Sequence, residues 1–416
     1  MVKSYISKRY TALRYPDFRI FIVGQGISAI GSQMQLVAVN WHIYELTHSP
    51  AALGLIGLMR FVPIVTFALF GGAVADSFNR KKLMFATTTI LGFFAVLLSL
   101  ITFTGSMTPI YMYMITVILA SVISFEMPAR HAFIPRLVPK EHLANAMSLN
   151  VITWQTAQIL GPAIAGIMIA RFGVSWVYAG NAVSYGAILL GLTYIKTSGR
   201  QETARAALSF EAIRDGFRFV RSKTVLWSTM ILDFVSNFFS AASTLMPIFA
   251  KDILHVGPEG LGMLYSAQSV GALIAGAALA HVGTTKNQGK LLLSGVAVYA
   301  CATMIFGLSQ IFALSLLSIA LVGVGDSIST VIRVTLRHLE TPDNMRGRMT
   351  SINSIFSMGG PQLGEFEAGL LASFIGTPLS VFFGGALTLG FVIYLATNVP
   401  TLRNYTQYKP DAELPI

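Results

Sequence analysis

Charge is scarce in this sequence, and acidic charge is the scarcer kind. Only 11% of the 416 residues are Asp, Glu, Lys or Arg, whereas a soluble domain carries about 25%. Acidic residues number 18 against 29 basic ones, which gives a formal net charge of +11. A chain with so few charged side chains cannot cover a water-facing surface, and this excludes an ordinary soluble domain.

Cysteine is almost absent as well. The single Cys301 lies in an apolar run, so a disulfide framework and a Cys-based metal site are both excluded. The sequence also lacks a His, Asp and Glu grouping with metal-ligand spacing, a nucleophile elbow and a phosphate-binding loop. It therefore predicts no catalytic residues, no metal and no cofactor, and argues against an enzyme.

Long apolar runs are abundant instead, since 54% of the residues are hydrophobic. A helix of about 20 apolar residues crosses a hydrocarbon core and satisfies its own backbone hydrogen bonds. The sequence predicts an all-α integral membrane protein with twelve spans. Their expected limits are 20–43, 51–75, 83–104, 110–134, 144–170, 175–196, 224–249, 260–280, 291–309, 311–336, 349–374 and 379–397.

Basic residues indicate the orientation of these spans, because Lys and Arg near helix ends stay in the cytoplasm. With both termini inside, only Arg171 and Lys251 fall on the outer side, and Arg60 lies within a span. The segment Met1–Arg19 is polar and basic and is no cleavable signal. We expect a multi-pass protein of the bacterial cytoplasmic membrane, whose positive charge reflects topology and implies no nucleic-acid partner.

The chain repeats itself at a shift of 203 residues. Residues 130–173 align with 333–376 with ten identities in 44 positions, where unrelated apolar segments would give roughly three or four. Since the shift carries one span onto another six later, it predicts two pseudo-symmetric six-helix bundles in parallel orientation. The expected division is 1–196 and 224–398 for the bundles, 197–223 for a cytoplasmic linker and 399–416 for a cytoplasmic tail.

The two copies differ where acids appear. Pro162, Ile164 and Ile123 correspond to Glu365, Glu367 and Asp326. These mismatches predict that the C-terminal half is specialised for protons. The linker differs in another way, because Phe210, Ile213, Phe217 and Val220 have helical spacing. They predict an amphipathic surface helix, with a plain tether or a regulatory element both left open.

Charged and polar residues inside the spans are the candidate site. A charge in the membrane is costly, so it should face a cavity or a partner. The proton-coupling or substrate-pathway candidates are Glu365, Asp326, Asp233, Glu126 and Arg60. The polar cavity candidates are Gln25, Gln155, Gln158, Asn237 and Trp154. Structural ion pairs and contacts between helices are the alternative roles. Glu365 and Glu367 cannot share a helix face, so at most one should line a cavity, and the other is expected to pack or to meet Arg333 or Arg337.

Two motifs resemble those of the major facilitator superfamily. The first runs from Gly72 through Asp76 to Arg80 and Lys81, and resembles the superfamily's signature after the second helix, although Ser77 and Asn79 depart from it. The resemblance implies a conformational latch formed by Gly72, Asp76, Arg80 and Lys81. The second motif contains Gly161, Pro162 and Gly166 and looks like the core of the antiporter signature. It implies a bent, closely packed helix that seals the closed state.

Smaller features resemble one branch of that superfamily, the enterobactin-exporter and macrolide-efflux group. They are Tyr15–Arg19, Gly31–Gln35, Arg60–Pro63, Pro135–Leu143 and Pro342–Arg348. The resemblance implies a monomeric, proton-driven exporter (antiporter) of a small amphipathic or anionic molecule, such as a siderophore or drug, that works by alternating access. An importer, or a lysophospholipid transporter or scramblase of the same fold, is the alternative.

Overall fold

The structure is a computed structural model that describes residues 11–199, 210–283, 287–342 and 345–406. Every regular element in these ranges is a helix. The chain divides into two units by its internal contacts. The first holds Met1–Ala207 and His255–Ser266, and the second holds Leu208–Leu254 and Ala267–Ile416.

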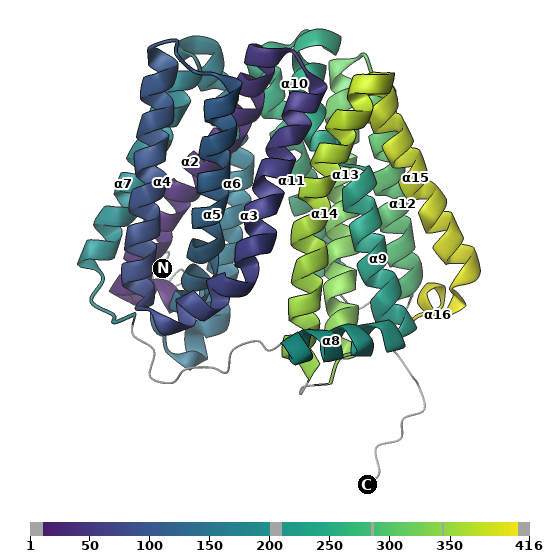
Figure 1. The fold of residues 1–416 in the computed structure, drawn as a ribbon. Helices are drawn as coiled ribbons and strands as arrows, with labels where there is room; N and C mark the ends of the chain where they lie inside the picture. Colours follow the sequence, from purple (N-terminus) through teal and green to yellow (C-terminus); the bar gives the residue numbers. More distant parts are fainter. Residues whose placement is uncertain (1–10, 200–209, 284–286, 343–344, 407–416) are drawn as a thin grey trace, which may run out of the picture. The chain divides into compact units, whose positions relative to one another are not determined.

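The first unit is a bundle in which α2 packs against α6 and α7, α3 against α5, and α4 against α5 and α7 (Figure 1). Proline begins α2, α3 and α5, where its missing N–H is no loss and its fixed φ suits the first turn. The helices are α2 (Pro16–Thr47), α3 (Pro50–Ser77), α4 (Arg80–Phe103), α5 (Pro109–Phe133), α6 (Leu143–Phe172) and α7 (Val174–Tyr194).

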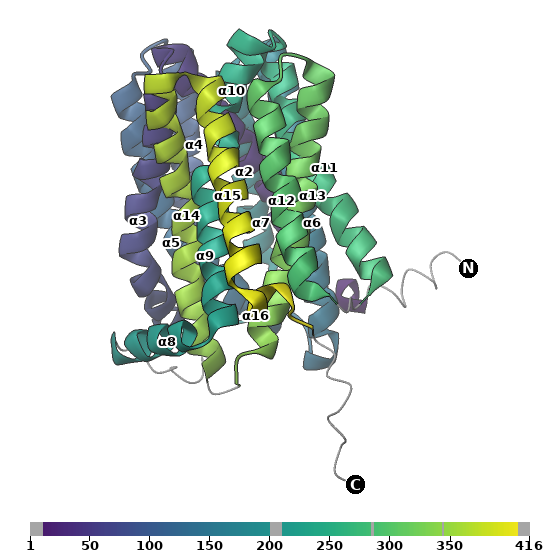
Figure 2. The same ribbon diagram turned by 90° about the vertical axis from the view of Figure 1, so that its right-hand side faces the viewer.

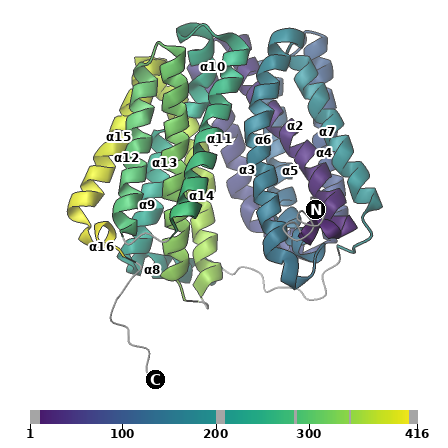
Figure 3. The same ribbon diagram turned by 180° about the vertical axis from the view of Figure 1, so that it is seen from behind.

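The second unit repeats this packing, with α9 against α14 and α15, and α12 against α13 and α15. Figure 3 shows α12, α13 and α15 as neighbours. Its helices are α8 (Phe210–Ser222), α9 (Thr224–Phe239), α12 (Gln288–Leu308), α13 (Phe312–Leu339), α14 (Arg346–Ile375), α15 (Thr377–Asn398) and α16 (Pro400–Arg403). The helix α11 (Gly257–Val282) belongs to the first unit as far as Ser266 and to the second beyond it.

Helix limits confirm the register of the repeat. The shift that aligns the two sequences carries Leu143–Phe172 of α6 onto Arg346–Ile375 of α14, residue for residue. Both helices end at a glycine with positive φ, 89° at Gly173 and 86° at Gly376. Only glycine adopts that backbone conformation at little cost, so the duplication preserved both the helices and their ends.

The seventh span differs from the expected continuous helix over 224–249. The helix α9 ends at Phe239, and a 3-10 turn, the short helix α10 (Met246–Ile248) and a π turn (Phe249–Ile253) follow. Pro247 lacks the amide hydrogen that a regular helix needs. The hydroxyl of Ser240 at the break bonds the Thr388 hydroxyl at 2.8 Å. The break gives this span an irregular segment that the hydropathy of the sequence did not reveal.

The linker contains the expected amphipathic helix, α8, which lies across the ends of α9 and α14 (Figures 1 and 2). The ring of Phe217 meets that of Trp227 edge-on at 5.6 Å. Val220 is buried in a cluster with Met349. An ion pair at 3.4 Å joins the exposed side chains of Arg348 and Asp215. The side chains of 210–213, including Phe210 and Ile213, lie outside the described residues.

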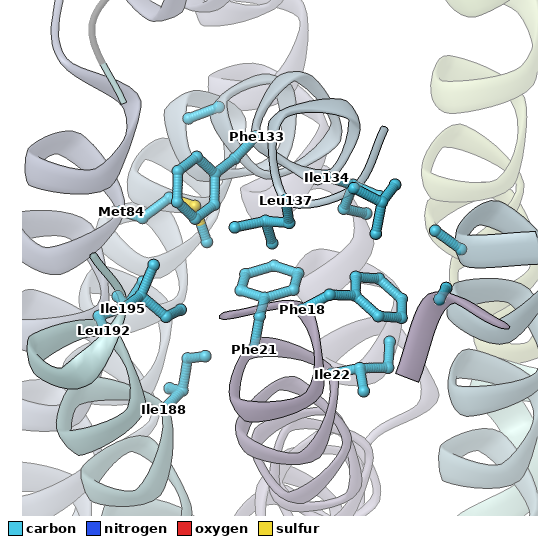
Figure 4. Packing of buried hydrophobic residues seen from close by; sticks show 14 residues of the cluster. Phe18, Phe21, Ile22, Met84, Phe133, Ile134, Leu137, Ile188, Leu192 and Ile195 are labelled. Carbon is cyan, nitrogen blue, oxygen red and sulfur yellow. The ribbon is translucent and has the colours of Figure 1, made fainter. Parts of the chain in front are cut away.

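The core of the first unit lies near the beginning of α2. Phe18 and Phe21 point among Met84, Phe133 and Leu137 (Figure 4). The rings of Phe21 and Phe133 meet edge-on with centroids 5.8 Å apart, an arrangement that aromatic pairs prefer. Burial of these side chains joins the ends of α2, α4, α5 and α7.

Many large apolar side chains are exposed elsewhere, as a lipid-facing surface requires. In the described ranges, ten helices or helix groups are long and apolar enough to cross a membrane. The two further expected spans coincide with α7 and α14, which are long enough but more polar. These findings confirm the all-α membrane architecture.

Candidate functional site

A cavity of about 350 Å³ opens inside the first unit, between α2, α5 and α6. Its wall includes Trp154 and three amide side chains, those of Gln25, Gln155 and Gln158. Four of the five polar cavity candidates therefore lie together. The fifth, Asn237, belongs to the second unit.

Arg130 is the charged group of this cavity, which we call the N-unit cavity. Its guanidinium carbon lies 5.9 Å from the ring centroid of Trp154, within the range of a cation–π contact. Its Nη1 lies 3.6 Å from Oε1 of Glu126, one turn earlier on α5, and the side chain is 12% exposed. The sequence interpretation assigned Arg130 to the cytoplasmic charges and missed it as a site residue. Its identity with Arg333 in the repeat was the available signal.

Asp233 on α9 is the centre of a charge cluster in the second unit. Its Oδ1 lies 2.9 Å from Nη1 of Arg333, and its Oδ2 lies 3.3 Å from Nη2 of Arg337. Each arginine side chain is only 4% exposed. Arg337 also donates to the carbonyl of Thr229 at 3.0 Å and to the side chain of Asn353. Asp233 is thus a buried counter-ion for two cations.

Asp326 joins this cluster from α13. Its Oδ1 lies 4.0 Å from Nη2 of Arg333, and its side chain is 44% exposed. Arg333 therefore stands between a buried carboxylate and a wetter one. Arg333 and Arg337 both form ion pairs with Asp233, and Arg333 forms a longer one with Asp326. That the acid outside the cavity packs against a helix or meets one of these arginines stays a prediction.

A smaller cavity of about 200 Å³ lies next to this cluster, lined by Glu365, Asn237 and Tyr299 among others. We call it the C-unit cavity. The Nδ2 of Asn237 donates to Oδ1 of Asp233 at 3.0 Å, so one amide separates the cavity from the ion cluster. Glu367 is half-buried and does not belong to the described lining. The two-residue offset has placed the acids on different faces, as expected.

The remaining charged candidates lie away from both cavities. Arg60 is half-buried on α3. Arg80 is buried and donates to the carbonyl of Ala132 at 3.1 Å. Lys81 donates to the carbonyl of Ile195 at 2.5 Å. The packing around Gly72 and the side chain of Asp76 are not described by the structure, so the role of Asp76 in the latch stays a prediction.

Asn79, a departure from the superfamily motif, caps α4. Its side-chain oxygen accepts the amides of Lys81 at 3.1 Å and Lys82 at 3.3 Å. Asparagine is among the best N-cap residues because it satisfies amides that have no partner in the first helical turn. The substitution therefore keeps the beginning of α4 well defined.

The glycines of the antiporter-like motif let α6 pack closely within the first unit. A Cβ on Gly161 would lie 2.5 Å from Cβ of Gln33 on α2. A Cβ on Gly166 would lie 2.5 Å from the carbonyl oxygen of Pro258 at the start of α11. Any larger residue would push these helices apart.

Comparison with known proteins gives the family. The model of the transmembrane secretion effector family matches residues 7–414. The chain belongs to this family. It is thus a membrane transporter of the major facilitator superfamily and not an enzyme.

Two similar relatives are named enterobactin exporter EntS. The protein of Citrobacter koseri is 25% identical over 401 residues, and that of Shigella boydii is 26% identical over 402. Each alignment covers 95% of both chains. A bacterial homologue of the human lysosomal transporter Spinster, solved in an inward-facing, unoccupied state, has a TM-score of 0.74 at 14% identity. It covers 95% of this chain and 99% of its own, and supports the fold alone.

No group of three or more His, Cys, Asp or Glu in the described ranges could hold a metal ion. The first unit presents a cation on an aromatic ring beside a cavity, and the second presents carboxylates that share buried arginines.

Proposed function

We propose that this protein is a proton-driven exporter of a small amphipathic or anionic molecule, such as a siderophore or drug. It works as a monomer by alternating access in the bacterial cytoplasmic membrane, with both termini in the cytoplasm. The observation that carries the proposal is Arg130, held on Trp154 at the wall of the N-unit cavity. The names of the relatives support export of such a molecule.

The N-unit cavity holds the substrate. Its volume of about 350 Å³ suits a small molecule or part of a larger one. An anionic group binds Arg130 in place of Glu126, whose contact at 3.6 Å is long for an ion pair. The amides of Gln25, Gln155 and Gln158 supply hydrogen bonds that orient the ligand.

The charge cluster of the second unit handles protons. Arg333 holds Asp233 at 2.9 Å and lies 4.0 Å from Asp326. Protonation of Asp326, the more exposed carboxylate, removes its attraction for Arg333, which then pairs with Asp233 alone. Asn237 connects this exchange to the C-unit cavity, where Glu365 is the next proton acceptor.

The close packing of α6 and the motif around Arg80 serve the conformational cycle. Gly161, Pro162 and Gly166 limit leakage by keeping α6 tight against its neighbours. Gly72, Asp76, Arg80 and Lys81 act as the latch at the beginning of α4. Small residues allow the backbones of two helices to come into close contact each time the helices meet.

Transport of enterobactin into inside-out membrane vesicles tests the proposal. We expect accumulation when the vesicle interior is acidic, and its loss when a protonophore collapses the gradient. Accumulation that survives the collapse would contradict proton coupling. Uptake confined to right-side-out vesicles would indicate an importer.

The matched pair Glu365→Gln and Glu367→Gln tests the C-unit cavity. Glu365 lines this cavity and Glu367 lies on another face of the same helix. We expect the first variant to lose gradient-driven transport while downhill exchange continues, and the second to retain both. Equal coupling in both variants would remove Glu365 from the proton path.

A further inference from the structure

The first unit has a second hollow, distinct from the N-unit cavity, that shares only Lys81 with the proposed latch. It has a volume of about 490 Å³ and lies between the start of α4 and the end of α7. Lysines line part of it, Lys81, Lys82 and Lys196, and apolar side chains line another part, including Phe85 and Leu192. We call it the lysine hollow.

Backbone contacts fix the shape of the lysine hollow. The amide of Arg80 donates to the carbonyl of Gly199 at 3.0 Å. A Cβ on Gly199 would overlap the Asn79 side chain and the amide of Lys81. Glycine at this place lets the chain after α7 lie directly on the first turn of α4. The backbone contact between Gly199 and the start of α4 therefore fixes one wall of the hollow.

The charges of the lysine hollow favour an anion. Lys81 uses one of its three ammonium donors on the carbonyl of Ile195, while Lys82 and Lys196 are exposed. The positive end of the α4 dipole adds to their field. The nearby carboxylate of Asp17 is engaged by the amides of Lys196 at 3.1 Å and Thr197 at 2.8 Å. The described lining includes three lysines and no acid.

The apolar side of the hollow faces the surface of the bundle. Phe85 is 42% exposed, and Thr193 and Ala86 beside it are exposed as well. These residues belong to α4 and α7, which span the membrane. A ligand bound here meets cations at one end and the acyl-chain region at the other.

We propose that the lysine hollow binds the phosphate of an anionic phospholipid, with the head group on the lysines and the acyl chains against Phe85. Basic pockets between transmembrane helices at the cytoplasmic side favour such head groups. Free phosphate shares the chemistry of the head group but has no acyl chain for the apolar wall. The inference does not depend on the transported substrate or on proton coupling.

Native mass spectrometry of the full-length protein in detergent tests this site. We titrate it with phosphatidylglycerol, phosphatidylcholine and inorganic phosphate. Phosphatidylglycerol is expected to bind more tightly than the other two. The variant K82Q/K196Q should bind it about twenty-five-fold more weakly, since each lysine contributes about a fivefold attraction. K82R/K196R should restore binding.

The matched control is Lys290→Gln. Lys290 is exposed at the start of α12, the counterpart of α4 in the second unit, and lies outside the lysine hollow. This variant should bind phosphatidylglycerol like the parent protein. If inorganic phosphate displaces the lipid at equal concentration, the hollow binds anions but the assignment of a phospholipid to it is overturned. Unchanged lipid binding by K82Q/K196Q, in protein with the parent's melting temperature, would overturn the site itself.

Discussion

Arg130 and Arg333 occupy the same position in the two copies of the repeat, yet their surroundings are different. Arg130 lies on Trp154 beside a cavity and makes a long contact with Glu126. Arg333 is buried and holds Asp233 at 2.9 Å. One duplicated scaffold thus supports a cation that faces a cavity in one unit and a buried ion cluster in the other.

Neighbouring substitutions explain this difference. Trp154 and Glu126 correspond to Ser357 and Ser329 in the second copy, and Ile123 corresponds to Asp326. The second copy has thus lost the aromatic platform, and its acid on this helix lies three residues earlier, at Asp326 instead of the position of Glu126. The backbone changed little, because α6 and α14 keep the same limits.

The largest expected effect is on the stability of the second unit. Asp233→Asn removes the counter-ion of buried Arg337 and the nearer of the two acids beside buried Arg333, which costs about 3–5 kcal/mol. The matched variant Glu126→Gln should cost less than about 1 kcal/mol, because Arg130 keeps its contact with Trp154 and is less buried. Thermal unfolding of purified protein measures both. Equal losses of stability in the two variants would contradict this difference between the two ion pairs.

Transport should depend on the arginine of the first unit. Arg130→Gln removes a charged partner of the substrate, and we expect transport to fall about 10- to 150-fold. Initial rates of enterobactin uptake, normalised to the amount of folded protein, measure this. Arg171→Gln, an exposed arginine at the far end of α6, is the control. A normal rate for Arg130→Gln would place the substrate elsewhere.

The shared glycines should show a smaller difference between the units. Gly364→Ala brings a Cβ within 2.5 Å of the backbone oxygens of Asn237 and Phe238, and overpacking of this kind costs about 1–3 kcal/mol. In Gly161→Ala the added Cβ lies 2.5 Å from Cβ of Gln33 but no nearer than 3.0 Å to a backbone atom, so this variant should cost less. Gly186→Ala, where no atom lies within 4 Å, is the control in thermal unfolding. A larger loss for Gly161→Ala would reverse this order.

The smallest effect concerns the aromatic platform. Trp154→Ala removes a cation–π contact worth about 0.5–2 kcal/mol, so the KM for enterobactin should rise roughly 2- to 30-fold. Trp154→Phe should have a smaller effect because the ring remains. Ser357→Ala, at the equivalent place of the second unit, should leave the KM unchanged. A KM indifferent to Trp154 would separate this residue from the substrate.

Much of the fold was predictable because membrane helices have a strong local signal. The limits of the spans, the repeat and the amphipathic helix α8 follow from apolar runs, identities and helical spacing. The break after Phe239 was not predicted, because the prediction rested on hydropathy and the segment stays apolar. Pro247 was the available signal. Asn79 as the cap of α4 was also not predicted, since its partners are two backbone amides.

The candidate site was only partly predictable. Gln25, Gln155, Gln158 and Trp154 were chosen for their polarity within apolar spans, and they line one cavity. Arg130 was missed because it lies near a helix end, where basic residues are expected for topology alone, and Arg333 and Arg337 were named only as partners of Glu365 or Glu367. The contact of Arg337 with Asp233 joins two different helices, and spacing along one helix does not identify such a contact.

The sequence by itself determined that this chain crosses a membrane repeatedly, contains a duplication and concentrates acids in its second copy. Apolar length and residue identity are local properties, and they survive in any arrangement of the helices. Only the tertiary structure decided which acid neutralises which arginine. Asp233 lies about a hundred residues before Arg333 and Arg337, and packing of α9 beside α13 brings their charges together where little water can replace the contact.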